Sequence, residues 1–192
     1  NFLLEGTIGK IPIFAKTELG YKNLIKLSSK SYLDSNVEND PHCNFDELVN
    51  LNQDLIILTG NQFDLFGELF KKNKLKEIEE NIKRLKISLK DRIYIEIQRH
   101  EEAGENSYEK FLINLSKKLD IPLIATQEVF YLEKNLFEAH DALICIGEKN
   151  FINDSKRKRY NDQHYLKSND DLKKIFKDLP EALENNYNFP YR

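Results

Sequence analysis

Short apolar runs and longer amphipathic stretches alternate along the chain, which predicts strands followed by helices. The strand-like runs are apolar and bounded by polar or turn-forming residues, and they cover residues 11–15, 55–58, 93–97 and 121–125. The stretches with apolar positions at helical spacing cover residues 18–33, 63–72, 75–89 and 107–119. This alternation indicates an α/β protein with a mainly parallel sheet and covering helices.

The pattern changes toward the C-terminus. After a helix expected to begin near Asn135, residues 150–161 are polar and typical of a loop. Ser168 is suited to cap a helix over 169–177, because a Ser hydroxyl accepts a hydrogen bond from a main-chain N–H of the first turn. Pro180 favours the start of another short helix, since proline is well tolerated in the first helical turn.

The length of 192 residues is enough for one domain or a large part of one. We expect a single domain over 1–192, with strand–helix units in 1–147 and a loop with C-terminal helices in 148–192. The chain begins at Asn1 with neither a Met nor a signal-like segment, and we interpret it as a fragment of a longer protein. Its two cysteines lie far apart in sequence, which favours a reducing, cytoplasmic environment.

Charge limits the classes of partner. Charged residues make up 32% of the chain, but the formal net charge is only −3, so no overall basic field attracts nucleic acid. One local basic run is a candidate for contact with DNA phosphates, with a solvated loop as the alternative, and consists of Lys156, Arg157, Lys158 and Arg159. No apolar run approaches the roughly 20 residues of a membrane-spanning helix.

The most informative segment is the strand over 121–125 and its polar end. In barrels and open α/β sheets, ligands collect at the carboxyl ends of strands. Here that end carries Gln127, Glu128 and Phe130, followed by Ala139-His140-Asp141 at the predicted helix.

Motifs along nearly the whole chain occur in the order of one family. They are A-K-T-E-L-G-Y-K-N-L from Ala15, L-T-G from Leu58, E-I-Q-R-H from Glu96, A-T-Q-E-V-F-Y-L from Ala125, Q-H-Y-L-K-S from Gln163 and L-P-E-A-L-E-N from Leu179. Together they resemble the PHP (polymerase and histidinol phosphatase) domain of bacterial DNA polymerase III alpha subunits. The resemblance implies part of a distorted (β/α)7 barrel, with metals held at the strand ends by His, Asp, Glu and Cys.

Several of the ligand positions that the resemblance implies carry unsuitable residue types. The family pattern has His, Cys, His, Asp and His where this chain has Lys10, Asn61, His100, Glu128 and Phe130. A phenyl ring cannot coordinate a metal, a protonated lysine has no lone pair, and an amide is a poor ligand beside a thiolate. We therefore expect a degenerate site without metal or other cofactor. One hypothesis is that Lys10 replaces part of the metal's charge and pairs with a buried Glu128.

Other candidate residues have simpler interpretations. His42 and Cys43 are metal-ligand types in a polar loop, and an ordinary structural role is the favoured alternative. His140 and Asp141 are either a ligand or base, or a hydrogen-bonding pair at a helix edge.

The resemblance implies a role in DNA replication for the parent protein, with magnesium bound in a later polymerase domain. This part would then be a scaffold that contacts the remaining polymerase domains and docks the proofreading exonuclease subunit. The alternatives are a metal-dependent phosphoesterase or 3'-5' exonuclease, and a histidinol-phosphatase-like enzyme. The ligand positions disfavour the first alternative, and the C-terminal motifs favour the polymerase branch over the second.

Overall fold

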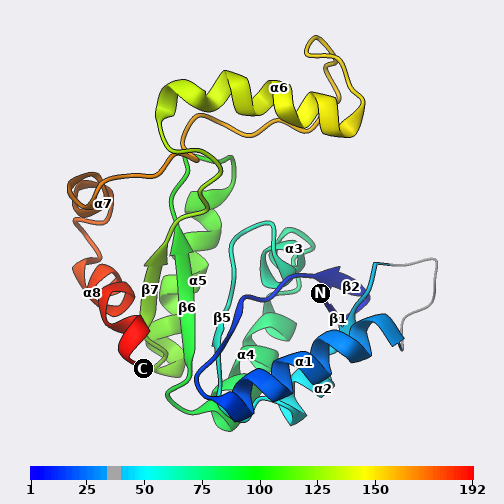
Figure 1. Ribbon diagram of the computed structural model, residues 1–192. Helices are drawn as coiled ribbons and strands as arrows, with labels where there is room; N and C mark the ends of the chain where they lie inside the picture. Colours follow the sequence, from blue (N-terminus) through cyan, green and yellow to red (C-terminus); the bar gives the residue numbers. More distant parts are fainter. Residues whose placement is uncertain (34–39) are drawn as a thin grey trace.

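The computed structural model of the chain describes residues 1–33 and 40–192, and it contains two small sheets with helices packed against them (Figure 1). The first sheet has the strand order β2-β1-β4, with β1 Phe2–Leu4, β2 Thr7–Gly9 and β4 Cys43–Asn44. The second has the order β3-β5-β6-β7, with β3 Ile13–Ala15, β5 Leu55–Leu58, β6 Ile93–Gln98 and β7 Leu123–Thr126.

The helices are α1 Glu18–Leu33, α2 Phe45–Asn50, α3 Leu65–Lys71, α4 Leu75–Leu89, α5 Glu105–Leu119, α6 Phe137–Glu148, α7 Asn169–Ile175 and α8 Pro180–Asn188, with 3-10 turns η1 Lys134–Leu136 and η2 Phe189–Tyr191. All of these helices except α2 follow stretches that the sequence predicts as helical, and α2, with six residues, is too short for a periodic signal. The bounds of α1 and α4 agree with the prediction at both ends. The Ser168 cap is confirmed, because its hydroxyl accepts a hydrogen bond from the N–H of Asp171. No helix in the described part of the chain combines the length and apolar composition needed to cross a membrane.

The α/β class is confirmed, but the strand directions are more varied than predicted. Strands β5, β6 and β7 are parallel, whereas β3 is antiparallel to β5. In the other sheet, β1 and β2 form an antiparallel hairpin that the sequence pattern did not reveal, because strands of three residues are too short for a periodic signal. The hairpin turns through two left-handed residues, Glu5 and Gly6. Closure of a (β/α)7 barrel stays a prediction.

Alternate residues of the four-stranded sheet face two different apolar clusters. Ile57, Ile95 and Ala125 point into the large core formed with the helices. The opposite face carries a small cluster made by Ile56, Leu58, Tyr94 and Ile124, and Phe189 from η2 packs against it. Polar residues continue this second face at the strand ends, so the sheet positions a polar pocket there.

Candidate functional site

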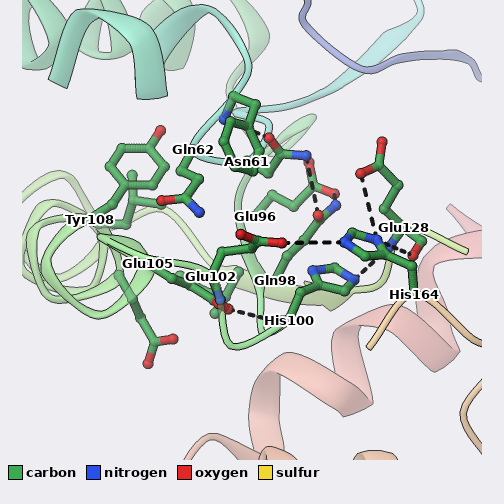
Figure 2. A pocket seen from close by; sticks show the side chains of 14 residues that line it. Asn61, Gln62, Glu96, Gln98, His100, Glu102, Glu105, Tyr108, Glu128 and His164 are labelled. Carbon is green, nitrogen blue, oxygen red and sulfur yellow. Dashed lines mark hydrogen bonds and ion pairs between the residues drawn. The ribbon is translucent and has the colours of Figure 1, made fainter. Parts of the chain in front are cut away.

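Strands β5, β6 and β7 end around a polar pocket whose side chains converge in Figure 2. It contains a cavity of about 30 Å³, which is room for a water-sized group. The polar side chains that line this pocket include Asn61, Glu96, Gln98, His100, Glu128 and His164. They come from the ends of three strands and from the loop before α7, so residues far apart in sequence build the pocket.

Asn61 has a structural role in the turn after β5. Gly60 adopts a left-handed φ of +81°, which turns the chain at the strand end. The side-chain oxygen of Asn61 accepts a hydrogen bond from the N–H of Phe63 at 2.8 Å. The main-chain N–H of Asn61 donates to the carboxylate of Asp64 at 2.9 Å. The Asn61 amide also donates to Gln98 at 3.2 Å, which joins the ends of β5 and β6.

Glu96 is a carboxylate buried within β6, and sequence reasoning did not select it. Its Oε1 accepts hydrogen bonds from the hydroxyl of Thr126 and, at 3.0 Å, from the amide of Gln98. Its Oε2 is buried and has no hydrogen-bond partner among the described residues. Burial raises the pKa of Glu96, and these hydrogen bonds oppose the rise only in part. The signal in the sequence was a charged residue in the middle of an otherwise apolar strand.

His100 and His164 form a stacked pair at the centre of the pocket. Their ring centroids are 4.3 Å apart and the rings are nearly parallel, at 6°. The Nε2 atom of His100 accepts a hydrogen bond from the N–H of Glu128 at 3.2 Å, so this lone pair is already used within the protein. Burial, followed by the charges of His164 and Lys167, lowers the pKa of His100 to about 3, so the ring is neutral near pH 7.

His164 is a second residue of this pocket that the sequence analysis missed. Its Nδ1 donates to the carbonyl of Glu128 at 3.1 Å, which leaves Nε2 as the acceptor nitrogen of the neutral ring. That Nε2 is buried without a hydrogen-bond partner in the described part of the chain, and it lies 3.7 Å from Oε1 of Glu102. The available signal was a histidine inside the motif Q-H-Y-L-K-S, which begins at Gln163.

A column of four aromatic rings runs through the pocket. His140 stacks on Phe130 at 5.3 Å, Phe130 stacks on His164 at 4.9 Å, and His164 stacks on His100. Tyr160 packs against Phe130 with ring centroids 4.5 Å apart. The side chain at position 130 therefore serves ring packing, with no donor atom to offer a ligand.

Comparison with known proteins agrees with this arrangement of strands and motifs. The model of the PHP domain matches residues 6–100. The chain is also 34% identical over 173 residues to the DNA polymerase III subunit alpha of Caulobacter vibrioides, 33% identical over 177 residues to that of Vibrio cholerae, and 34% identical over 183 residues to that of Rickettsia prowazekii. The chain belongs to the PHP domain family. The alignments cover 90%, 92% and 95% of the chain, but only 15%, 15% and 16% of these relatives.

The ligand positions of a metal-binding PHP domain do not fit a metal in this chain. Lys10 offers an exposed ammonium group and Phe130 a phenyl ring, neither of which can bind a metal. The side-chain amide of Asn61 already donates a hydrogen bond to Gln98. His100 uses its Nε2 lone pair within the protein. Across the described ranges, no three His, Cys, Asp or Glu side chains gather in a way that could hold a metal ion.

The hypothesis of a buried pair between Lys10 and Glu128 is wrong. Lys10 is exposed, the side chain of Glu128 is 40% exposed, and no ion pair within 4.0 Å joins these two described residues. The carboxylate lies instead beside the ring of His164, with Oε2 3.9 Å from Nδ1. Because solvent reaches Glu128, it does not require a buried cation.

The other residues predicted as possible ligands or DNA contacts pack inside the PHP domain or lie at its surface. His140 lies in the ring column, and Asp141 forms a buried ion pair with Arg157, in which the two side chains are 7% and 5% exposed. Lys156, Lys158 and Arg159 lie at the surface, and the prediction of DNA contact rests on them alone. The thiol of Cys43, at the start of β4, is buried and donates to the carbonyl of Leu27. Nδ1 of His42, just before this strand, lies 2.7 Å from the carbonyl of Asp40.

Proposed function

We propose that this chain is the PHP module of a replicative DNA polymerase III alpha subunit and acts as a structural scaffold rather than as a hydrolase. The parent protein would carry out template-directed DNA synthesis in the cytoplasm, with magnesium bound outside this module. The named relatives support the replicative setting, because all three are DNA polymerase III alpha subunits. The scaffold would contact the remaining polymerase domains and dock the proofreading exonuclease subunit.

The observation that carries the scaffold proposal is the use of His100 within the protein. Its Nε2 lone pair accepts from the N–H of Glu128, and its ring is stacked on that of His164. A metal on this nitrogen would have to displace the hydrogen bond from Glu128. The neighbouring ring of Phe130 offers no replacement ligand, so the residues at the strand ends support packing better than metal chemistry.

Helix α6 supports the docking part of the proposal. It projects away from the two sheets in Figure 1, and its outer apolar side chains are exposed. Leu143 is 64% exposed, Ile146 is 76% exposed and, just beyond the helix, Phe151 is 78% exposed. A group of exposed apolar side chains of this kind is typical of a protein contact surface.

A metal-dependent phosphoesterase or 3'-5' exonuclease is the second candidate, and one observation favours it. The Nε2 atom of His164 is buried without a hydrogen-bond partner among the described residues, and it lies 3.7 Å from the carboxylate of Glu102. A histidine nitrogen and a carboxylate are ligand types for divalent metals, whereas the carboxylate of Glu128 faces the other ring nitrogen, Nδ1.

Elemental analysis together with a nuclease assay separates the two candidates. Protein purified without chelator is expected to contain less than one equivalent of zinc, manganese or iron, and to leave primer DNA intact with added manganese. Two or more equivalents of metal, or a nuclease activity that disappears in His164→Phe and in His100→Ala, would establish the hydrolase instead. Binding of the proofreading subunit tests the scaffold role. We expect Ile146→Ser and Phe151→Ser to weaken it, and Tyr187→Ser, an equally exposed change on α8, to leave it unchanged.

A further inference from the structure

A cleft lies between the C-terminal end of α3 and the N-terminal end of α5. It encloses about 380 Å³, a volume within the range of small-molecule sites. Its lining includes Gln62, Phe70, Lys71, Ser107 and Tyr108. It shares Gln62 and Tyr108 with the strand-end pocket, and Figure 2 shows both side chains at the end of that pocket opposite His164. The cleft is therefore distinct from the part of the pocket that the histidine rings occupy.

The cleft contains a buried amide that has no partner within the described protein. Gln62 is 8% exposed, and its side-chain amide makes no hydrogen bond with another residue that the structure describes. Gly104 lies beside it in a left-handed conformation, and a Cβ atom built on this glycine would be 3.5 Å from Oε1 of Gln62. Because a buried amide without a partner is costly, a ligand that both donates and accepts a hydrogen bond would stabilise this side chain.

Two aromatic rings line the same cleft. The ring centroids of Phe70 and Tyr108 are 5.2 Å apart, and their planes are tilted by 55°. Aromatic side chains stack on nucleobases because every base has a flat π-face. The amide of a glutamine adds selectivity, because its donor and acceptor match N7 and the N6 amino group of adenine.

The rim of the cleft carries a cation that a ligand can recruit. Nζ of Lys71 pairs with Glu68 at 2.7 Å, but the two side chains are 44% and 36% exposed, and such a pair contributes little to stability. Lys72 and Lys74 of the same turn donate instead to the β1–β2 hairpin. Across the cleft, Ser107 lies in the first turn of α5, and a helix N-terminus favours negative charge.

We propose that this cleft is an adenine-nucleotide site. The base would pair with the amide of Gln62 and pack against the two rings, and the phosphate would lie between Lys71 and the first turn of α5. Either a free nucleotide or the adenine nucleotide of a single strand has this chemistry. The site does not depend on the proposed scaffold function, because it uses none of the residues at the vestigial metal positions except the neighbouring turn after β5.

The test is an NMR titration of the folded chain with dAMP. Deoxyadenosine, dCMP and inorganic phosphate are titrated in parallel, and (dA)4 distinguishes a strand from a free nucleotide. Gln62→Leu removes the amide from a buried position, and Lys71→Gln removes the cation. Lys76→Gln is the matched control, because this exposed lysine belongs to the same segment but does not line the cleft.

We expect dAMP to shift the amide signals of Phe70, Gly104 and Ser107 with saturation. Gln62→Leu should weaken dAMP about tenfold, as for one lost amide–base pair, and should remove the preference for dAMP over dCMP. Lys71→Gln should weaken dAMP but not deoxyadenosine, and Lys76→Gln should change neither. Tighter binding of (dA)4 than of dAMP would assign the site to a strand, and equal binding would assign it to the free nucleotide.

Three results would overturn the proposal. They are shifts that phosphate alone reproduces, shifts that do not saturate, and dAMP binding that survives both Gln62→Leu and Lys71→Gln. If circular dichroism shows that Gln62→Leu is unfolded, Gln62→Glu decides by the same titration, because it keeps the size of the side chain and replaces the amide donor with a carboxylate oxygen.

Discussion

The ring of Phe130 stacks on that of His164, with centroids 4.9 Å apart and an angle of 27° between the ring planes. His164 also donates from Nδ1 to the main-chain carbonyl of Glu128, two positions before Phe130, so the same imidazole makes both the ring contact and a hydrogen bond to the end of β7.

The two stacked rings should be energetically coupled. We expect Phe130→His and His164→Phe each to destabilise the fold, the second by about 1–3 kcal/mol because it leaves the carbonyl of Glu128 without its donor. The double exchange should recover part of the loss, with a coupling free energy of about 0.5–1.5 kcal/mol, typical of aromatic pairs. Urea unfolding of the four proteins measures the cycle. Phe151→His, at an exposed site, is the control, and strictly additive effects would show that the rings are not coupled.

His100 should make the fold sensitive to acid. Burial lowers the pKa of its ring from 6.5 to about 3, so below pH 6.5 the unfolded chain takes up a proton that the folded chain does not. The free energy of unfolding therefore does not depend on the titration of His100 above pH 6.5. As the pH falls from 6.5 toward 3 it decreases, by at most about 1.4 kcal/mol per pH unit.

The His100→Phe variant tests this acid sensitivity. It keeps a ring against His164 but cannot be protonated, so its unfolding free energy should fall less steeply than that of the parent chain between pH 6.5 and 4. Urea unfolding at several pH values measures the slope. Equal slopes for His100→Phe and the parent chain would contradict the prediction.

Arg99 should be an important ion-pairing residue of the fold. Its guanidinium binds both oxygens of Glu109, at 2.9 and 2.6 Å, and both oxygens of Asp178. Arg99→Met leaves Glu109, whose side chain is only 14% exposed, without its partner, and we expect a loss of about 3–5 kcal/mol. Arg84→Met breaks an exposed pair with Asp46 and should cost about 1 kcal/mol or less in the same unfolding measurement. Similar losses in the two variants would contradict the prediction.

Asp178 should contribute to stability only above strongly acidic pH. Its hydrogen bonds with Arg99 lower the pKa of the carboxyl group from 3.8 to about 2. The contribution is therefore complete above pH 3.8 and is lost as the pH falls toward 2. Because this side chain is 57% exposed, we expect Asp178→Asn to cost about 1 kcal/mol or less at pH 7. The difference from the parent chain should disappear near pH 2, and a difference that grows on acidification would contradict this.

Arg157 should hold the loop after α6 in place. Its guanidinium binds both oxygens of Asp141 on α6, and its Nε donates to the carbonyl of Ile152 at 2.9 Å. We expect Arg157→Met to increase amide hydrogen exchange over 150–161 while β6 keeps its protection. Arg159→Met removes a cation of the same loop that lies farther from Asp141, at 3.7 Å, and should change the exchange little. Equal effects of the two changes would assign the order of the loop to other contacts.

The sequence by itself determined the longer helices, because helical periodicity is a local property, but it missed α2, which has only six residues. Every main-chain hydrogen bond inside a helix joins residues four positions apart, so a stretch of a dozen residues already carries the signal. The bounds of α1 and α4 were predicted at both ends for this reason. Strands β5, β6 and β7 were located to within two residues by their apolar runs, and the family motifs placed His100 and Phe130 at strand ends.

Only the tertiary structure decided the direction of β3, the place of His164 and the contacts of the asparagines of α8. An apolar run does not encode which neighbour a strand meets or in which direction it runs. His164 contacts the carbonyl of Glu128 across 36 positions, and Asn186 reaches Ala125 across 61. A polar residue in a loop or on a helix has no periodic pattern that names its partner, because that partner is set by how whole elements pack. The set of side chains that meet in the pocket therefore follows only from the tertiary structure, which brings the strand ends and the C-terminal segments together.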